Sequence, residues 1–458
     1  MSPAELFGDG EHAALAPVLR QLGPDTLALL RRGAMQQTAL RGDAVTSTRH
    51  STTGSALETV GPSARRHTFT GACSAAALHR LAEAAQGSGA AAAPEAAGWE
   101  ALDAGDELPV EVAAALPRLA GQLADRMLSG GHPGLLPLIN ADATRTRIAV
   151  LRADGTLATD DRLYLELRVG ARIAGAPATA RSLRVVSAAS LELLLKGDRH
   201  LAAADEVVRG ALARTDAVDP PEGELPVVLG PAGPAALLHE VCGHGLEADV
   251  ACAPRGAYQD LLGRRVASPL VTVVDDPGMP SWAPLYRVDD EGRAAGPTTL
   301  IDRGVLAGYL ADGEVSRRTG HPATGNGRRL DHAHPALSRM SCTYLAAGQA
   351  PPEEALAGIR RGLYVRSVVT GETDMSGGEF TADVTESFLV ENGRITAPVR
   401  SATLHGSGTD VLRQVDVVCD DLDFLAYGYH CNKQGQFPLK VSVGQPTLRI
   451  RALGVTGA

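Results

Sequence analysis

The sequence predicts an α+β protein in which an N-terminal α/β domain precedes a β-rich C-terminal domain. Its 458 residues exceed one ordinary domain and favour two or three. Helix-like and strand-like patterns alternate in the first half, whereas the second half holds many strand-like runs and one prominent helix. The Pro- and acid-rich segment 216–226 is typical of a linker, so we assign residues 1–222 to the first domain and 223–458 to the second.

The N-terminal domain is predicted to contain a β-hairpin between helices. Two strand-like runs flank the turn signal Asp154-Gly155, and a later Ala- and Leu-rich stretch contains Gly197-Asp198, which can divide it. The segment 86–106 is low in complexity, so we expect a mobile surface excursion there. The predicted elements are a helix over 74–85, a hairpin over 147–170 and helices over 190–215.

The C-terminal domain is predicted to begin with a short buried strand at 227–230, followed by a helix that starts near Pro234. This helix carries the segment His-Glu-Val-Cys-Gly-His, residues 239–244. Beyond it, turn signals separate apolar and alternating runs that are typical of strands. These runs cover 270–276, 298–304, 304–310, 380–398, 415–421 and 439–444.

Composition argues against several classes of protein. The net charge of −10 opposes binding to nucleic acid, because neutralising phosphates needs clustered Lys and Arg. No window offers the ~20 uninterrupted apolar residues of a membrane-spanning helix, and the N-terminus lacks the features of an export signal. Six cysteines spread over this length form no disulfide framework. We therefore expect a cytoplasmic protein with free thiols that binds neither nucleic acid nor membrane.

The spacing of His239 and His244 makes an unusual demand on the helix that carries them. A regular helix turns ~100° per residue, so side chains five positions apart point ~140° apart. Both imidazoles can reach one metal ion if the helix widens locally or ends near Gly243, because π-bulges occur at functional sites and glycine tolerates the distortion. The segment therefore predicts a metal site on an irregular turn.

Glu240, next to the first histidine, is placed to act as a general base on a water molecule that the metal activates. A catalytic zinc usually takes three protein ligands, so the two histidines need a third. The alternative is that both histidines are hydrogen-bonded helix residues without a catalytic role. From spacing alone, the candidates for the third ligand are Cys242, Glu247, Cys252, Cys419 and Cys431.

Several separated segments resemble one family. The segment HEVCGHGLEAD, residues 239–249, resembles the HExxxH signature of the TldD/PmbA metallopeptidases, and specifically the TldD side of that family. The N-terminal domain matches the family only loosely, and Cys342 stands where the family has Asn. The other similar segments are TGNGRR at 324–329 with 334–345, GGEF at 377–380 with 386–398, CNKQGQ at 431–436 and VGQPTLRI at 443–450.

The resemblance implies a complete metal site. In the family, the Cys that opens the CNKQGQ-like segment joins the two His on the metal, so Cys431 would join His239 and His244. Cys242 would then be a small packing residue, and the same holds for Cys73, Cys252 and Cys419. The implied cofactor is one transition metal ion, for which zinc is the default, while iron would bind the same atoms.

The resemblance also implies a reaction and a partner. A TldD-type subunit pairs with a homologous TldE-type subunit that lacks the metal ligands, so this chain would be the catalytic peptidase subunit, with Glu240 as its base. Its substrates would be small or unfolded peptides, which the family is thought to bind by adding a strand to a sheet edge. Gly377 and Gly378 would permit such an approach, although they equally suit a turn. Two alternatives remain: a biosynthetic tailoring enzyme that cleaves an amide in a modified peptide, a leader peptide or a small molecule, and a non-catalytic partner subunit.

Overall fold

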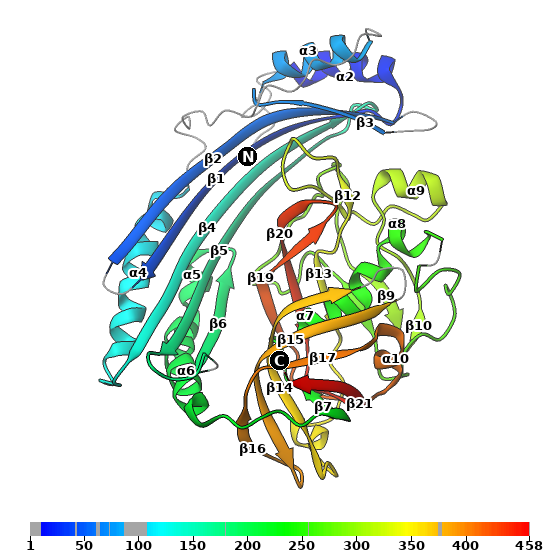
Figure 1. Cartoon of the computed structure of the whole chain (residues 1–458). Helices are drawn as coiled ribbons and strands as arrows, with labels where there is room; N and C mark the ends of the chain where they lie inside the picture. Colours follow the sequence, from blue (N-terminus) through cyan, green and yellow to red (C-terminus); the bar gives the residue numbers. More distant parts are fainter. Residues whose placement is uncertain are drawn as a thin grey trace.

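A long, curved N-terminal sheet packs against a C-terminal domain that contains two further large sheets (Figure 1). The structure is a computed structural model, and it describes residues 11–41, 44–60, 65–72, 74–86, 108–178, 180–254, 256–373 and 378–457. Within these ranges no helix is long and apolar enough to cross a membrane. The low-complexity segment expected at 86–106 lies outside the described residues from position 87 onwards.

The N-terminal sheet consists of β1 (Leu27–Arg41), β2 (Ala44–Val60), β3 (Arg65–Thr70), β4 (Leu135–Arg152), β5 (Leu157–Ile173) and β6 (Arg181–Ala188). The order is β3-β2-β1-β4-β5-β6, and all neighbours are antiparallel. The predicted hairpin is confirmed, because Leu151 pairs with Leu157 across the turn that contains Asp154-Gly155. Strands β1 and β2, which pair along their length, were not predicted.

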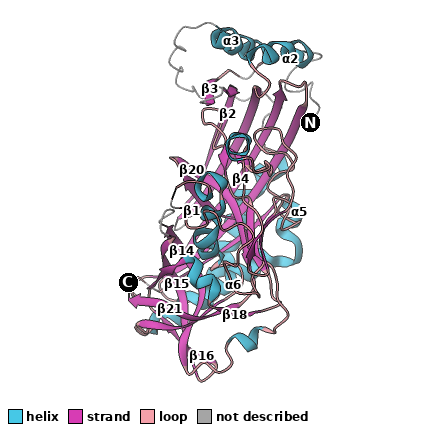
Figure 2. Ribbon diagram, turned by 90° about the vertical axis from the view of Figure 1, so that its right-hand side faces the viewer, coloured by secondary structure: helices cyan, strands magenta, loops and turns pink. Residues whose placement is uncertain are grey.

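The helices of the N-terminal domain are α2 (Glu11–Leu22), α3 (Ala75–Gln86), α4 (Val110–Leu128), α5 (Leu191–Leu195) and α6 (Arg199–Ala213). Helices α2 and α3 lie together at one end of the sheet (Figures 1 and 2), whereas α4 and α6 pack on it towards the other end. The helix predicted at 74–85 is confirmed by α3. The stretch 190–215 is divided as expected, at a 3-10 turn in which Gly197 has a φ of 67°.

The C-terminal domain is β-rich, as predicted. One sheet has the order β10-β9-β8-β13-β20-β19, and the other has the order β14-β7-β21-β17-β15-β16, with β18 beside β21. An additional pairing of β14 with β15 closes the path through the second sheet. The first sheet consists of β8 (Val273–Asp275), β9 (Thr298–Asp302), β10 (Val305–Leu306), β13 (Cys342–Leu345), β19 (Asp423–Lys433) and β20 (Gln436–Gln445). The second sheet consists of β7 (Gly223–Leu229), β14 (Arg361–Thr373), β15 (Glu379–Glu391), β16 (Arg394–Val399), β17 (Ala402–Ser407), β18 (Val415–Val418) and β21 (Leu448–Gly457). A separate two-stranded sheet is formed by β11 (Gly327–Arg328) and β12 (Leu337–Ser338).

The helix that carries the histidine motif lies between these two sheets. After β7 the chain enters α7 (Ala235–Leu238), which packs against β14 of one sheet and against β13 and β20 of the other. Strand β7 begins at Gly223, so the last residues of the predicted linker 216–226 belong to the sheet, where they pair with β21. The remaining helical segments are α8 (Ala248–Ala251), α9 (Gly313–Thr319), η5 (Pro352–Ala355) and α10 (Gly408–Arg413).

Candidate metal centre

The motif with His239 and His244 forms an irregular helix. Helix α7 continues into a π-helical turn, His239–Gly243, and then into a 3-10 turn, His244–Leu246. The backbone N–H of His244 donates to the carbonyl of His239, five residues back, which is the hydrogen bond of a π-turn. A Cβ at Gly243 would lie only 2.1 Å from Sδ of Met340, so any other residue there would require the Met340 side chain to move. The local widening that the five-residue spacing requires is therefore present.

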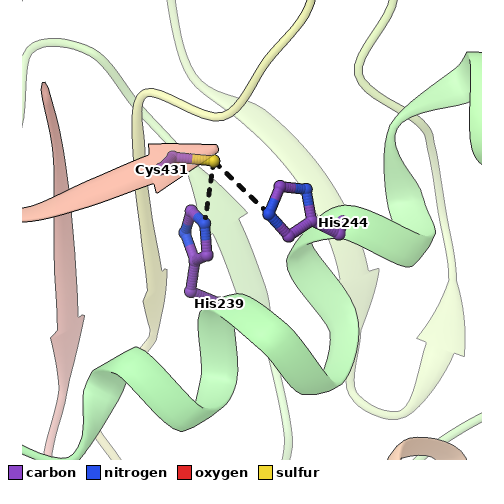
Figure 3. Close-up of side chains that lie close together, drawn as sticks. All are labelled: His239, His244 and Cys431. Carbon is purple, nitrogen blue, oxygen red and sulfur yellow. Dashed lines mark hydrogen bonds between the residues drawn. The ribbon is translucent and has the colours of Figure 1, made fainter. Parts of the chain in front are cut away.

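Three donor atoms from distant parts of the sequence converge at this turn. Nε2 of His239 and Nε2 of His244 each lie 3.3 Å from Sγ of Cys431, which stands on β19 (Figure 3). The three atoms all lie within 4.8 Å of one another, and the three side chains are buried. Among the described residues, this is the one group of three or more His, Cys, Asp or Glu side chains close enough to share an ion.

Charged side chains lie directly behind one of these histidines. Nδ1 of His244 is 3.0 Å from Oε2 of Glu247, which is fully buried. Nζ of Lys433 donates to the same oxygen at 2.9 Å and to Oδ1 of Asp249 at 2.7 Å. A carboxylate behind a metal-binding imidazole fixes the orientation of the ring and makes the imidazole a better electron donor. Glu247, a candidate ligand on spacing alone, thus contacts a histidine from behind instead of joining the three donors.

The charges in the cluster favour a thiolate. Burial alone would raise the pKa of Cys431, but His239 and His244 outweigh burial and hold it well below its ordinary value. Burial opposes a charge on His244, but Glu247 and Cys431 together raise the pKa of this imidazole well above its ordinary value. Burial would also raise the pKa of Glu247, yet Lys433 and His244 lower it to about 2. The neighbouring charges therefore favour the ionised form of the Cys431 thiol, which is the form that binds a metal ion.

Glu240 lies beside the donor atoms and is itself held by a residue that was not predicted. The hydroxyl of Tyr429 donates to Oε1 of Glu240 at 2.8 Å. Burial and the Glu240 carboxylate raise the pKa of Tyr429, so the hydroxyl keeps its proton. Tyr429 and Lys433 stand two residues before and after Cys431, and side chains two apart on a strand share a face. That alternation was the signal in the sequence that could have revealed both residues.

The other cysteines that spacing left open are not brought to the cluster. Cys242 is buried within the helix, where its thiol contacts the carbonyl oxygen of Leu238 at 3.3 Å, and burial raises its pKa to about 12. Cys252 and Cys419 are free thiols outside the group of donors. Cys73 lies outside the described residues.

Of the two glycines predicted to contact a substrate, only Gly378 lies within the described residues. Gly377 lies outside the described residues. Gly378 has a φ of 75°, a conformation that favours glycine, and its carbonyl accepts a hydrogen bond from the N–H of Gly408 at 2.8 Å. Its backbone conformation therefore accounts for a glycine at this position, and a contact with substrate stays a prediction.

The donor set fits a transition metal. Two imidazole nitrogens and one thiolate sulfur form a three-ligand set that leaves a further position for water or substrate, as catalytic metal sites require. The three atoms are buried, close together and supported by Glu247 and Lys433. The arrangement can hold a Lewis-acidic ion close to the carboxylate of Glu240, which does not belong to the group of three donors.

The chain resembles metalloproteases in its sequence. Residues 222–457 match the family model described as the PmbA/TldA metallopeptidase C-terminal domain. A "Metalloprotease TldD homolog" of Haemophilus influenzae is 37% identical over 318 residues, which cover 68% of this chain and 65% of that protein. A "Zinc metalloprotease TldD homolog" of Saccharolobus solfataricus is 33% identical over 240 residues, which cover 52% of this chain and 53% of that protein. The matched residues thus span about half to just under two thirds of the length of these relatives.

A solved structure shares the whole fold. TldE from Thermococcus kodakarensis superposes with a TM-score of 0.75 and 16% sequence identity, over 98% of this chain and 100% of that one. At this identity the likeness concerns the fold alone. The family model covers more than half of the chain, including the π-turn and the strand with Cys431. The chain therefore belongs to the TldD/PmbA family.

Proposed function

We propose that this chain is the catalytic subunit of a metal-dependent peptidase that hydrolyses peptide bonds in small or unfolded peptides. The observation that carries the proposal is the convergence of His239, His244 and Cys431 beside Glu240 in a buried site. Family membership and the names of the similar metalloproteases support the same class of reaction. A non-catalytic subunit would have no need of this donor set, so its presence favours the catalytic role.

Zinc is the metal we propose, with one ion held by His239, His244 and Cys431. Three ligands of this kind are typical of catalytic zinc, and one relative carries zinc in its name. Iron would bind the same atoms, and metal analysis distinguishes the two. When bound, the ion would polarise the scissile carbonyl and acidify the attacking water.

Glu240 is the general base in this proposal. Its carboxylate takes the proton of the attacking water and returns it to the leaving amine, which is the role of a base placed beside the reacting atoms. The side chain is only 7% exposed, so little bulk water competes with this transfer. Glu247 and Lys433 contribute indirectly, because they keep the His244 ring in a fixed orientation.

The proposed assembly is a pair of homologous subunits in the cytoplasm. A TldE-like partner would share this fold, as the likeness to a TldE structure indicates. A peptide would bind in an extended form by adding a strand to a sheet edge, because main-chain hydrogen bonds hold a peptide with little dependence on its side chains. Strand β15, which begins next to Gly378, pairs with both β14 and β17, so another strand would have to offer that edge. Such binding suits substrates that are extended and not folded.

The proposal is tested by purifying the chain together with a homologous partner, measuring its metal content and digesting a peptide library. We expect about one zinc per chain, and cleavage that stops on chelation and returns with zinc. Glu240→Gln should keep the metal and lose turnover. Glu353→Gln, at an exposed glutamate of η5, is the matched control and should stay active. Peptidase activity retained in Glu240→Gln would refute the assignment of the base.

A further inference from the structure

One face of strand β19 supplies three side chains to the metal helix. Tyr429, Cys431 and Lys433 occupy alternate positions, so they project from the same side of the strand. Each meets a different part of the helical segment: Tyr429 meets Glu240, Cys431 meets the two histidines, and Lys433 meets Glu247. The strand therefore contacts the proposed base as directly as it contacts the proposed ligands.

Tyr429 makes two contacts in the centre. Its hydroxyl donates to Oε1 of Glu240 at 2.8 Å, and its ring lies edge-on against His239, with 4.9 Å between the ring centroids. The carboxylate of Glu240 stands at the end of a side chain with three rotatable bonds, and a hydrogen bond of this length removes much of that freedom. Tyr429 thus fixes the position of the carboxylate relative to a ligand ring.

We infer that Tyr429 is a positioning residue that holds Glu240 in the orientation its role as base requires. The inference rests on the proposed function, because it assigns Tyr429 a part in the same reaction. Packing alone would need the ring of Tyr429 and not its hydroxyl, whereas the hydroxyl contacts the carboxylate of Glu240, the residue that directly follows His239.

Tyr427 is a built-in comparison on the same strand. It is fully buried, and its hydroxyl donates to the carbonyl of Pro284 at 3.1 Å, away from the donor atoms. Loss of either hydroxyl removes one hydrogen bond from a largely enclosed tyrosine. Only the loss at Tyr429 removes a hydrogen bond to the carboxylate of Glu240, so the two variants separate positioning from a general effect on folding.

The test compares Tyr429→Phe with Tyr427→Phe in the zinc-loaded complex with its partner. Displacing a catalytic group by about 1 Å can cost on the order of 100-fold in rate, so we expect Tyr429→Phe to lower kcat by about 10- to 100-fold. Its KM and its zinc content should stay within about twofold of the wild type, since neither the ligands nor the peptide contacts change. Tyr427→Phe should keep kcat. A kcat within twofold of the wild type in Tyr429→Phe, or a loss of zinc or of folded protein, overturns the inference.

A double variant tests whether Tyr429 acts through Glu240. Glu240→Asp withdraws the carboxylate from the hydroxyl by one methylene, so adding Tyr429→Phe to it should change the residual rate by less than about twofold. The same rate loss in both backgrounds would show that Tyr429 acts independently of Glu240 and would overturn the inference. Inactivity of the wild-type complex towards every peptide would instead overturn the proposed function itself, so the two failures are distinguishable.

Discussion

Two buried clusters of charged side chains differ in how their groups are arranged. At the domain interface, Nη1 of Arg329 donates to Oε1 of Glu58 at 2.7 Å, and Nη1 of Arg162 donates to Oδ1 of Asp290 at 2.8 Å. Cations and carboxylates alternate there, so the cluster neutralises itself. In the metal centre, by contrast, three electron-pair donors converge within 4.8 Å of one another.

This difference shows what distinguishes a functional cluster from a structural one. Burial is common to both, because Arg329 and His239 are each at most 1% exposed. A cluster in which opposite charges alternate is electrically balanced without a bound ion. Electron-pair donors that converge on one point, in contrast, are balanced by binding a cation. Variants in the metal centre should therefore change metal content and activity, and variants at the interface should change the free energy of unfolding.

The largest effect is expected from Cys431→Ala, which removes one of the three convergent donors. A catalytic metal site needs all three protein ligands, so we expect the loss of the metal and of all measurable peptidase activity. Cys242→Ala is the matched control, because it removes a buried thiol from the same helical segment that lies outside the group of three donors. Metal content of the two purified proteins decides between them. Stoichiometric zinc in Cys431→Ala would mean that convergence of donors does not identify the ligands.

The site could be predicted only in part because its members come from distant segments. The spacing of His239 and His244 indicated a distorted helix, and such a turn is present. The spacing could not select Cys431, which lies 187 residues beyond His244 and is brought there by strand β19. Tyr429 was missed for the same reason, since its partner Glu240 is 189 residues away.

Arg329→Met should have the next largest effect, on stability. The substitution removes the guanidinium that donates to the buried carboxylate of Glu58, and breaking a buried ion pair from one side costs about 3–5 kcal/mol in the free energy of unfolding. The folded fraction should still bind zinc. Arg126→Met is the matched control, because Arg126 also pairs with a carboxylate, that of Asp205, but at an exposed position. Equal unfolding midpoints in urea for the two variants would contradict the contrast between the clusters.

The fold was predictable where a single periodicity dominates a segment. The hairpin of β4 and β5 and the helix α3 have clear patterns, and both are present. Strand β1 has the sequence LALLRRGAMQQTALR, which is rich in helix-forming residues. Its first four residues are buried, the next three are half-buried, and the remaining ones alternate between buried and more exposed. Pairing with β2 and β4 on both sides makes it a strand, and such long-range contacts are invisible in one sequence.

The smallest effect is expected where the N-terminal sheet carries two carboxylates of like charge. Asp142 on β4 faces Glu166 on β5, and burial, followed by the charge of Glu166, raises the pKa of Asp142 to about 6. A carboxyl whose pKa is raised on folding holds its proton more tightly in the folded state. Its contribution to stability is therefore full below about pH 4 and is lost as the pH rises through about 6.

Asp142→Asn removes this loss, because the amide stays neutral at every pH. With allowance for the partial exposure of Asp142, we expect the variant to gain about 1 kcal/mol of unfolding free energy over the wild type at pH 7.5, and much less near pH 4. Urea unfolding of both proteins at the two pH values measures the difference. A gain of the same size at both pH values would assign the effect to hydrogen bonding or packing. The two carboxylates of the sheet would then not be an unbalanced charge that contrasts with the neutralised ion pairs of Arg329 and Arg162.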